Sequence, residues 1–279
     1  MHDLMTVIAV LPAAQAVSAV IAAHEKLSPR EGGKLIGLMV VPILIPNLPP
    51  PSFMLPEVID VLIESSRRAI GEAESAFKEA CNKAGVPCEW RMAEIPITHV
   101  SSYAGGLSRA ADLIIAPQCP EADAIGRHEA DQLVLASGRP VLTLPVDWTG
   151  PTLGTRALVA WNGRREAARA VFDALPLLKR SEAVRLLSVR ETAHEQLGQF
   201  TPGDEIAATL ARHGVEVDVA AIHCERASVS EDIRAHAQEF AADLLVMGCY
   251  GHSRLRETIL GGVTHDMLRY APMPLLLSS

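Results

Sequence analysis

The sequence of 279 residues contains one pattern of segments twice, and this repeat restricts the folds that the chain can adopt. The segment ADLIIA at residues 111–116 returns as ADLLVM at residues 242–247, and the short apolar runs before and after each copy follow in the same order. We therefore predict two tandem domains, residues 1–150 and 151–279, which are joined by turn-forming residues around position 150.

Short apolar runs alternate with helical patterns in each half. The runs are rich in Val, Ile and Leu and do not alternate with polar residues, which is typical of parallel strands buried on both faces. Alternating strands and helices indicate a doubly wound α/β domain, so we predict two such parallel-sheet domains with five strands each. In the second half we expect strands at 156–160, 184–189, 215–222, 244–248 and 274–277, and helices at 164–175, 204–213, 230–240 and 260–270.

The last strand of each half, at 141–144 and 274–277, is short and apolar. Left at the edge of a sheet, such a strand would expose unpaired backbone groups. We therefore expect the two halves to pack through these strands as a pseudo-dimer within one chain. Ligands of such sheets bind beyond the carboxyl ends of the strands.

Composition excludes several classes of partner. The formal net charge is −8, neither half is basic and aromatic residues make up 4%, which argues against a nucleic-acid surface. The five cysteines are scattered without a C-x-x-C pair, and no basic residue precedes Lys26, so we expect reduced thiols in a cytoplasmic protein. Residues 35–56 lack charge but contain six prolines, which favours a short buried strand and a proline-rich connection over a membrane span.

A glycine pattern, G-x2-G-x9-G-G-x-T, follows the predicted strand at 244–248 and leads into a helix. Glycines at positions 248, 251, 261 and 262 let backbone N–H groups converge on an anion, and a helix start adds free donors and a favourable dipole. The Thr264 hydroxyl could donate to a phosphate or cap the helix. The alternative is that these glycines only reverse the chain between strand and helix. The spacing matches neither a P-loop nor a dinucleotide fingerprint.

The pattern resembles that of the universal stress protein family, whose ATP-binding members carry G-x2-G-x9-G-[ST]. The resemblance extends to AWNGRREAA at residues 160–168 and to LRYAPMP at residues 268–274, and it covers the chain as a tandem pair of such domains. It implies the adenine nucleotide alpha hydrolase-like fold in both halves, and it implies that two chains can associate further as a homodimer.

By this resemblance an adenine nucleotide would bind to the second half as ATP, alone or with Mg²⁺. Asn162 stands where the family usually has Asp, and Gly262 replaces the usual Ser or Thr, so one charge and one hydroxyl donor are lost. The implied binding residues are Ala160, Trp161, Asn162, Val189, Met247, Gly248, Gly251, Gly261, Gly262, Val263 and Thr264.

The first half lacks this loop. Pro117 and Pro120 occupy the places of Gly248 and Gly251, and proline has no N–H to donate. Glu121 and Asp123 add negative charge where a phosphate would need the opposite. We therefore expect a degenerate domain that binds no nucleotide and packs against the second half.

Three functions follow from these observations. The first is an ATP-binding protein with a regulatory role in stress response, in which the ligand is coupled to conformation rather than efficiently turned over. The second is a slow ATP hydrolase on the same fold, and the third is an interaction scaffold without nucleotide. Glu257 and Asp266 lie near the loop in sequence, but neither forms a recognisable catalytic pattern, and no catalytic or metal-ligating residue is assigned.

Overall fold

The structure is a computed structural model of the chain, and it describes residues 4–27, 33–43, 56–96, 100–118, 130–145, 148–190, 203–224, 226–249 and 262–279. Ten strands form one continuous sheet in the order β3-β2-β1-β4-β5-β10-β9-β6-β7-β8. Their bounds are β1 Thr6–Val10, β2 Lys34–Ile43, β3 Cys88–Pro96, β4 Leu113–Pro117, β5 Val141–Leu144, β6 Arg156–Ala160, β7 Ala183–Arg190, β8 Val217–His223, β9 Leu244–Gly248 and β10 Leu275–Ser278.

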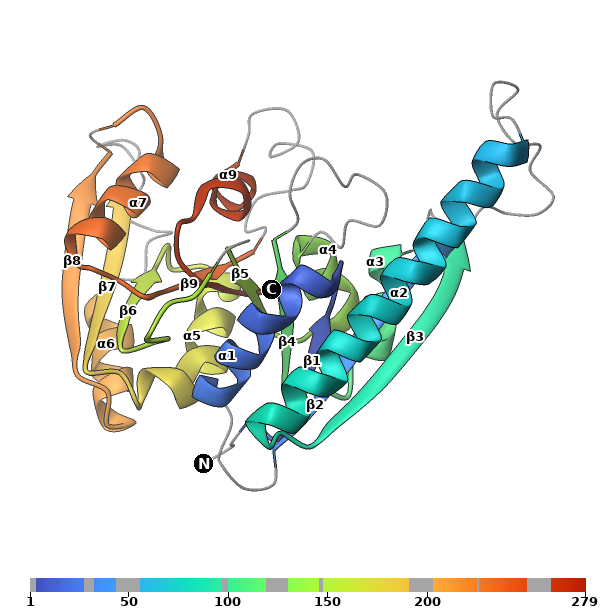
Figure 1. Cartoon of the computed structure of the whole chain (residues 1–279). Coiled ribbons are helices and arrows are strands. Elements are labelled where there is room, and N and C mark those ends of the chain that lie inside the picture. The colour runs from blue at the N-terminus through green and yellow to red at the C-terminus, as the bar shows by residue number, and fades with distance from the viewer. Residues whose placement is uncertain are drawn as a thin grey trace.

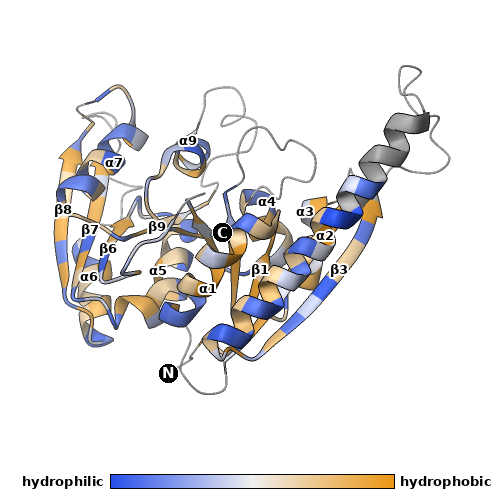
Figure 2. Cartoon of the chain, viewed as in Figure 1, coloured by the Kyte–Doolittle hydropathy of each residue, from blue (hydrophilic) through white to orange (hydrophobic). Residues whose placement is uncertain are grey.

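Helices cover both faces of this sheet (Figure 1). Helices α1, α2, α5 and α6 contribute to one hydrophobic cluster, and α3, α4, α7 and α9 contribute to a second cluster on the opposite face. Inner strands such as β1 are hydrophobic along most of their length, whereas the outer strand β3 also carries hydrophilic residues, as Figure 2 shows. The helices are the short 3-10 helix η1 Ala14–Ala16 and α1 Val17–Leu27, α2 Pro56–Ala84, α3 Val100–Leu107, α4 Ala130–Ser137, α5 Arg165–Leu178, α6 Gly203–Arg212, α7 Val229–Glu239 and α9 Val263–Tyr270.

Strands β5 and β10 join the two halves. Leu276 lies opposite Leu142 and Leu277 opposite Val141 in an antiparallel pair, whereas every other strand pair of the sheet is parallel. The predicted α/β fold with five strands in each half is confirmed, and so is the pairing of the two last strands. The joined edges leave β3 and β8 as the outer strands of the sheet.

The repeated Ala-Asp-Leu segment has a structural role. The Asp112 carboxylate accepts hydrogen bonds from the backbone N–H groups of Met5 and Thr6, at 3.0 and 2.8 Å. Asp243 accepts the equivalent bonds from Thr155 and Arg156, at 3.1 and 2.8 Å. In each half this aspartate therefore fixes the first strand beside the fourth, which explains why the motif occurs twice.

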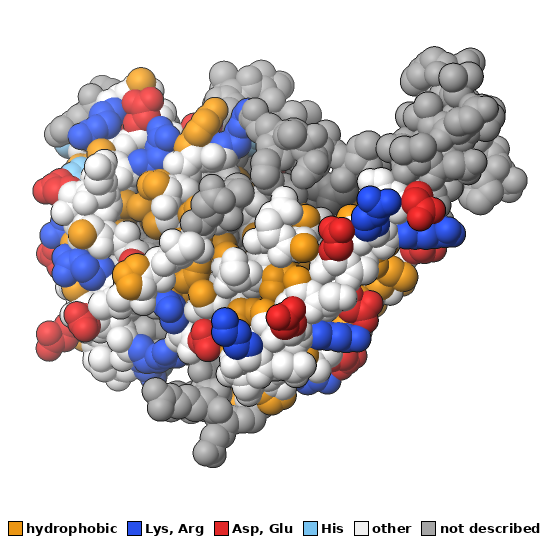
Figure 3. Space-filling model, in the orientation of Figure 1, with side chains coloured by type: hydrophobic (Ala, Val, Ile, Leu, Met, Phe, Trp, Pro, Cys, Tyr) orange, Lys and Arg blue, Asp and Glu red, His pale blue; other side chains and the backbone are white. Residues whose placement is uncertain are grey.

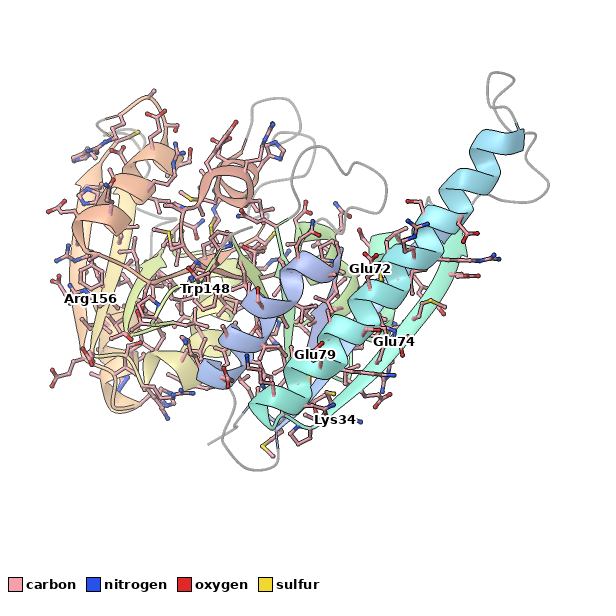
Figure 4. The ribbon with its side chains drawn as sticks, in the orientation of Figure 1. Lys34, Glu72, Glu74, Glu79, Trp148 and Arg156 are labelled. Carbon is pink, nitrogen blue, oxygen red and sulfur yellow. The ribbon has the colours of Figure 1, made fainter. Side chains whose placement is uncertain are left out.

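Side chains also hold the halves together away from the sheet. The Arg180 guanidinium, just after α5, donates to the carbonyl oxygens of Lys26 and Leu27 at 2.5 and 3.0 Å, which are among the last carbonyls of α1. The Gln118 amide donates to the carbonyl oxygen of Leu268 at 3.0 Å. Trp148 belongs to the predicted connection between the halves and is buried between them (Figure 4). The connecting segment is therefore packed into the core at this residue.

The first half carries an arm that the sequence interpretation did not anticipate. Helix α2 and strand β3 project together beyond the body of the molecule (Figure 1), and Glu72, Glu74 and Glu79 lie along this helix (Figure 4). The predicted short strand after Leu35 is wrong in length, because β2 runs for ten residues through Pro42. The pairing of β2 with β1 ends at Leu38, and beyond that point β2 pairs only with β3 among the described strands. Since β1 has already ended, the missing N–H of Pro42 does not remove a hydrogen bond to β1.

Most predicted boundaries in the second half lie within three residues of the observed ones. The main difference is α5, which continues to Leu178 although the sequence predicts an end before Pro176. Proline in the last turn removes one backbone hydrogen bond. Leu177 and Leu178 are buried in the first cluster, and this packing keeps the last turn helical.

The surface shows no segregation of charge on the face in view. In Figure 3, acidic and basic side chains alternate along the arm and over the second half. Within the described residues, none of the helices combines the length and the apolar character needed to cross a bilayer.

Candidate functional site

The carboxyl ends of β6 and β9 lie side by side, with Ala160 opposite Met247. From β6 the chain passes through α5 to β7 on one side, and from β9 it passes to β10 on the other side. The connections thus leave two neighbouring strands in opposite directions. This is a topological switch point, where open α/β sheets leave a crevice for a ligand.

Four of the predicted binding residues share one layer here. Met247 is a buried member of the second hydrophobic cluster, and Ala160, Val189 and Val263 pack against that cluster while remaining partly exposed. They come from β6, β7, β9 and the start of α9, so all four lie on the face of the sheet that this cluster covers, and Ala160 and Met247 are direct neighbours.

Trp161 is placed differently from these four. Its indole is buried in the first cluster, on the opposite face of the sheet, and its backbone N–H donates to the Leu187 carbonyl oxygen at 2.8 Å. The side chain therefore faces away from Val189 and Met247, and the backbone of Trp161 is the part that lies at the strand end.

Asn162 forms the turn that starts α5. Its side-chain oxygen accepts a hydrogen bond from the Arg164 backbone N–H at 3.1 Å, and Gly163 adopts a positive φ of 72°. Asn162 is exposed. Since an aspartate could accept the same bond, the asparagine preserves the turn and changes only the charge offered to solvent.

Gly248 is required by packing at the end of β9. A Cβ atom at this position would lie 2.5 Å from both the backbone nitrogen of Ala167 and the carbonyl carbon of Glu166. Its φ is not positive, so the close approach of α5, rather than an unusual backbone angle, demands glycine here. The phosphate interpretation is therefore not needed to explain this glycine.

The amino end of α9 offers backbone donors. Gly262 precedes the helix in an extended conformation, with φ −64° and ψ 157°, and no side chain of its own caps the first turn. Thr264 is buried, and the Asp266 carboxylate accepts a hydrogen bond from the Ser230 hydroxyl at 2.8 Å. Asp266 is thus held by α7 and stabilises the contact between the two helices.

Gly251 and Gly261 lie outside the described residues, as do the other members of the loop at 250–261, Glu257 included. Pro120, Glu121 and Asp123 of the first half are also outside them. The expectations for these residues stay predictions.

Pro117 can be compared directly with Gly248. Pro117 ends β4 and is buried, and the next residue, Gln118, donates its N–H to the Leu144 carbonyl oxygen at 2.8 Å. Cys249, after Gly248, donates to the Ser278 carbonyl oxygen at 2.7 Å. The two positions are equivalent in the sheet, so the first half carries proline where the second carries its strand-end glycine.

Glu166 was not predicted from the sequence. Its backbone lies against Gly248, its side chain is 8% exposed, and its carboxylate accepts a hydrogen bond from the Arg165 Nε at 2.5 Å. That hydrogen bond raises the pKa of Arg165 above its usual value. An acidic residue in the first turn of a helix that follows an Asn-Gly turn is a signal that the sequence contains. Across the described ranges, no three His, Cys, Asp or Glu side chains cluster as metal ligands would.

Comparison with known proteins supports the identity of this α/β fold. The model of the universal stress protein family matches residues 155–278. The universal stress protein Slr1230 of Synechocystis sp. is 37% identical over 148 residues, which are 52% of this chain and 49% of that protein. The match thus spans about half the length of this curated relative.

Solved structures share the fold over nearly the whole chain. A universal stress protein from Archaeoglobus fulgidus is 17% identical, with a TM-score of 0.70, and the match covers 99% of this chain and 97% of that one. A protein of unknown function from Pseudomonas aeruginosa PAO1 is 15% identical, with a TM-score of 0.55 and coverage of 99% and 92%. The molecule is thus a doubly wound α/β protein, and its topological switch point lies between β6 and β9. Its residues 155–278 form a domain that matches the universal stress protein family.

Proposed function

We propose that the second half, residues 151–279, binds one adenine nucleotide, ATP, at the carboxyl ends of β6 and β9. The observation that carries this proposal is the switch point, where Ala160 lies opposite Met247, and both residues contribute with Val189 and Val263 to the apolar cluster on one face of the sheet. An adenine ring needs an apolar wall of this kind, and a few well-placed polar groups then fix its orientation.

The phosphates would face the start of α9. The N–H groups of its first turn have no capping side chain from Gly262, and the helix dipole favours an anion at this end. Asp266 adds one negative charge to that turn, although its hydrogen bond to Ser230 holds it towards α7. A Mg²⁺ ion bound with the nucleotide would offset part of this charge.

We further propose that the first half, residues 1–150, serves as a packing partner without nucleotide. Pro117 removes one backbone donor at the position equivalent to Gly248. The protein would then act in the cytoplasm as a regulatory member of its family in stress response, with the ligand coupled to conformation. A homodimer of chains stays a prediction that sedimentation of the purified protein would check.

Variants of Gly262 test the nucleotide site. Its extended backbone suits an N-cap residue, so Gly262→Asp and Gly262→Ser should both fold and cap α9. The aspartate places a carboxylate where the phosphates would bind, whereas the serine supplies a neutral hydroxyl. We expect Gly262→Asp to weaken ATP binding at least about tenfold, and Gly262→Ser to keep or strengthen it.

The assay is calorimetric titration of the full chain with ATP, with and without Mg²⁺, followed by a check for released ADP. cAMP, which one universal stress protein holds in its solved structure, is titrated in parallel. Equal ATP affinity for parent and Gly262→Asp would place the site elsewhere. The absence of any nucleotide binding by the parent would overturn the proposal in favour of a scaffold.

A further inference from the structure

Two thiols meet where α2 turns into β3. Cys81 lies in the last turns of α2 and is fully buried, while Cys88 is the first residue of β3 and is partly exposed. Both pack in the first hydrophobic cluster, and Cys88 lies close enough to raise the pKa of Cys81. The pair cannot be recognised from the sequence, because six residues separate the two cysteines and their spacing is not a familiar thiol motif.

The backbone fixes this contact from both sides. The Val86 N–H donates to the Cys81 carbonyl oxygen at 2.9 Å, and Gly85 makes the reversal with a positive φ of 67°. On the other side, the Leu35 N–H donates to the Pro87 carbonyl oxygen at 3.0 Å, and Cys88 is in register with Leu35 of β2. These backbone contacts close the turn, so the start of β3 is held beside the last turns of α2.

We propose that Cys81 and Cys88 form a reversible redox pair, which a peroxide converts into a disulfide. The Cys88 sulfur attacks one peroxide oxygen, the O–O bond breaks, and water leaves with the thiol proton, which gives a sulfenic acid on Cys88. The Cys81 sulfur then attacks the Cys88 sulfur, the S–O bond breaks, and a second water leaves with the Cys81 proton. Together the thiols lose two electrons, and the peroxide gains them.

The order of attack follows from the surroundings of each thiol. Burial, together with the neighbouring Cys88, raises the pKa of Cys81 to about 12, so Cys81 stays protonated at neutral pH. Cys88 is the partly exposed member of the pair and is the one that a peroxide from solvent can reach. Cys81 is therefore not the thiol that reacts with the peroxide. It reacts second, by attacking the oxidised sulfur of Cys88 and losing its proton.

The disulfide would fasten the end of α2 to the edge strand β3. Lys34, at the start of β2, marks this end of the arm in Figure 4. Five strands separate β3 from β9, so the pair is remote from the proposed nucleotide site and is tested independently of it. Since a disulfide restricts the unfolded chain, oxidation should raise the melting temperature by a few degrees.

Tryptic peptides of the full chain distinguish the two states. Trypsin cleaves after Lys78, Lys83 and Arg91, so Cys81 lies on the peptide 79–83 and Cys88 on the peptide 84–91. The protein is treated with increasing hydrogen peroxide, free thiols are alkylated, and the digest is analysed by mass spectrometry. We expect the two peptides to become joined in a dose-dependent way, and dithiothreitol to separate them again.

Controls separate this pair from general thiol oxidation. Cys224→Ser should leave the joined peptide unchanged, because Cys224 instead contacts the Arg226 carbonyl oxygen at 3.6 Å. Cys88→Ser should abolish it. The parent decides the question even if that variant fails to fold, since the oxidised chain must run as a monomer on a non-reducing gel. Cys88 found only as sulfinic acid, or joined peptides found only in a disulfide-linked dimer, would overturn the proposal.

Discussion

Replacing Gly248 with alanine tests whether this residue is glycine for reasons of packing. The new Cβ would lie 2.5 Å from backbone atoms of Glu166 and Ala167 and 2.8 Å from the Glu166 Cβ. Because backbone atoms of α5 cannot swing aside as a flexible side chain can, either α5 or the end of β9 must shift. Overpacking costs about 1–3 kcal/mol, and we expect a loss of unfolding free energy near 3 kcal/mol here.

Urea denaturation followed by circular dichroism measures this loss. With typical urea dependences, about 3 kcal/mol lowers the midpoint by roughly 1 M or more. Gly106→Ala is the matched control, because a Cβ at Gly106 in α3 meets nothing within 4 Å. It should gain up to about 1 kcal/mol from helix propensity. A Gly248→Ala variant that unfolds at the same urea concentration as the parent would refute the packing argument and return Gly248 to a role in ligand binding.

Three further predictions concern stability. Asp112→Ala and Asp243→Ala should each lower the unfolding free energy, measured in urea, by about 1–3 kcal/mol, because each removes two backbone hydrogen bonds to a charged acceptor. A marked difference between the two variants would contradict equivalent roles for the two aspartates. Arg180→Ala should lower the melting temperature by releasing the last carbonyls of α1, and an unchanged melting curve would show that this contact is not stabilising. Burial lowers the pKa of His24 below 6.5, so the unfolded chain binds its proton first. The parent should therefore lose stability relative to His24→Gln as the pH falls below 6.5, by at most about 1.4 kcal/mol per pH unit, and parallel melting curves between pH 8 and 5 would disprove this.

The strand framework could be predicted because it depends on strong local signals. Apolar runs such as those of β6 and β9 are bounded by turn residues and separated by helices, and both strands have the predicted bounds. The pairing of β5 with β10 followed from the cost of two exposed apolar edges. In these elements, local pattern and tertiary packing favour the same structure.

The arm could not be predicted because its features depend on neighbours. Pro42 indicates a connection when read locally, and it lies in a strand only because β1 ends before that point. The contact between Cys81 and Cys88 likewise arises from the turn at Gly85, which closes the end of α2 against β3. Local sequence patterns do not predict such features, because they depend on where a neighbouring strand or helix ends.

Some residues that belong to a sequence motif have a structural role, and the sequence alone does not distinguish this role from ligand binding. Asp112 and Asp243 repeat because each fixes a strand, not because both halves share a ligand. Val189 and Met247 can be recognised as candidate site residues only once the sheet places both on the face covered by the second hydrophobic cluster. Trp161 follows Ala160 directly, but its side chain lies in the first cluster on the opposite face.

The asymmetry of the two halves follows from the end of the fourth strand in each. At the end of β9, Gly248 leaves room for the backbone of α5, so the first turn of that helix packs directly against the strand end. At the equivalent point of β4, Pro117 fills space with a ring and has no N–H. One substitution thus alters both the packing of the following elements and the donors available to an anion. A search for a ligand in the first half should therefore not assume a phosphate loop there, because the strand that would present such a loop ends in proline.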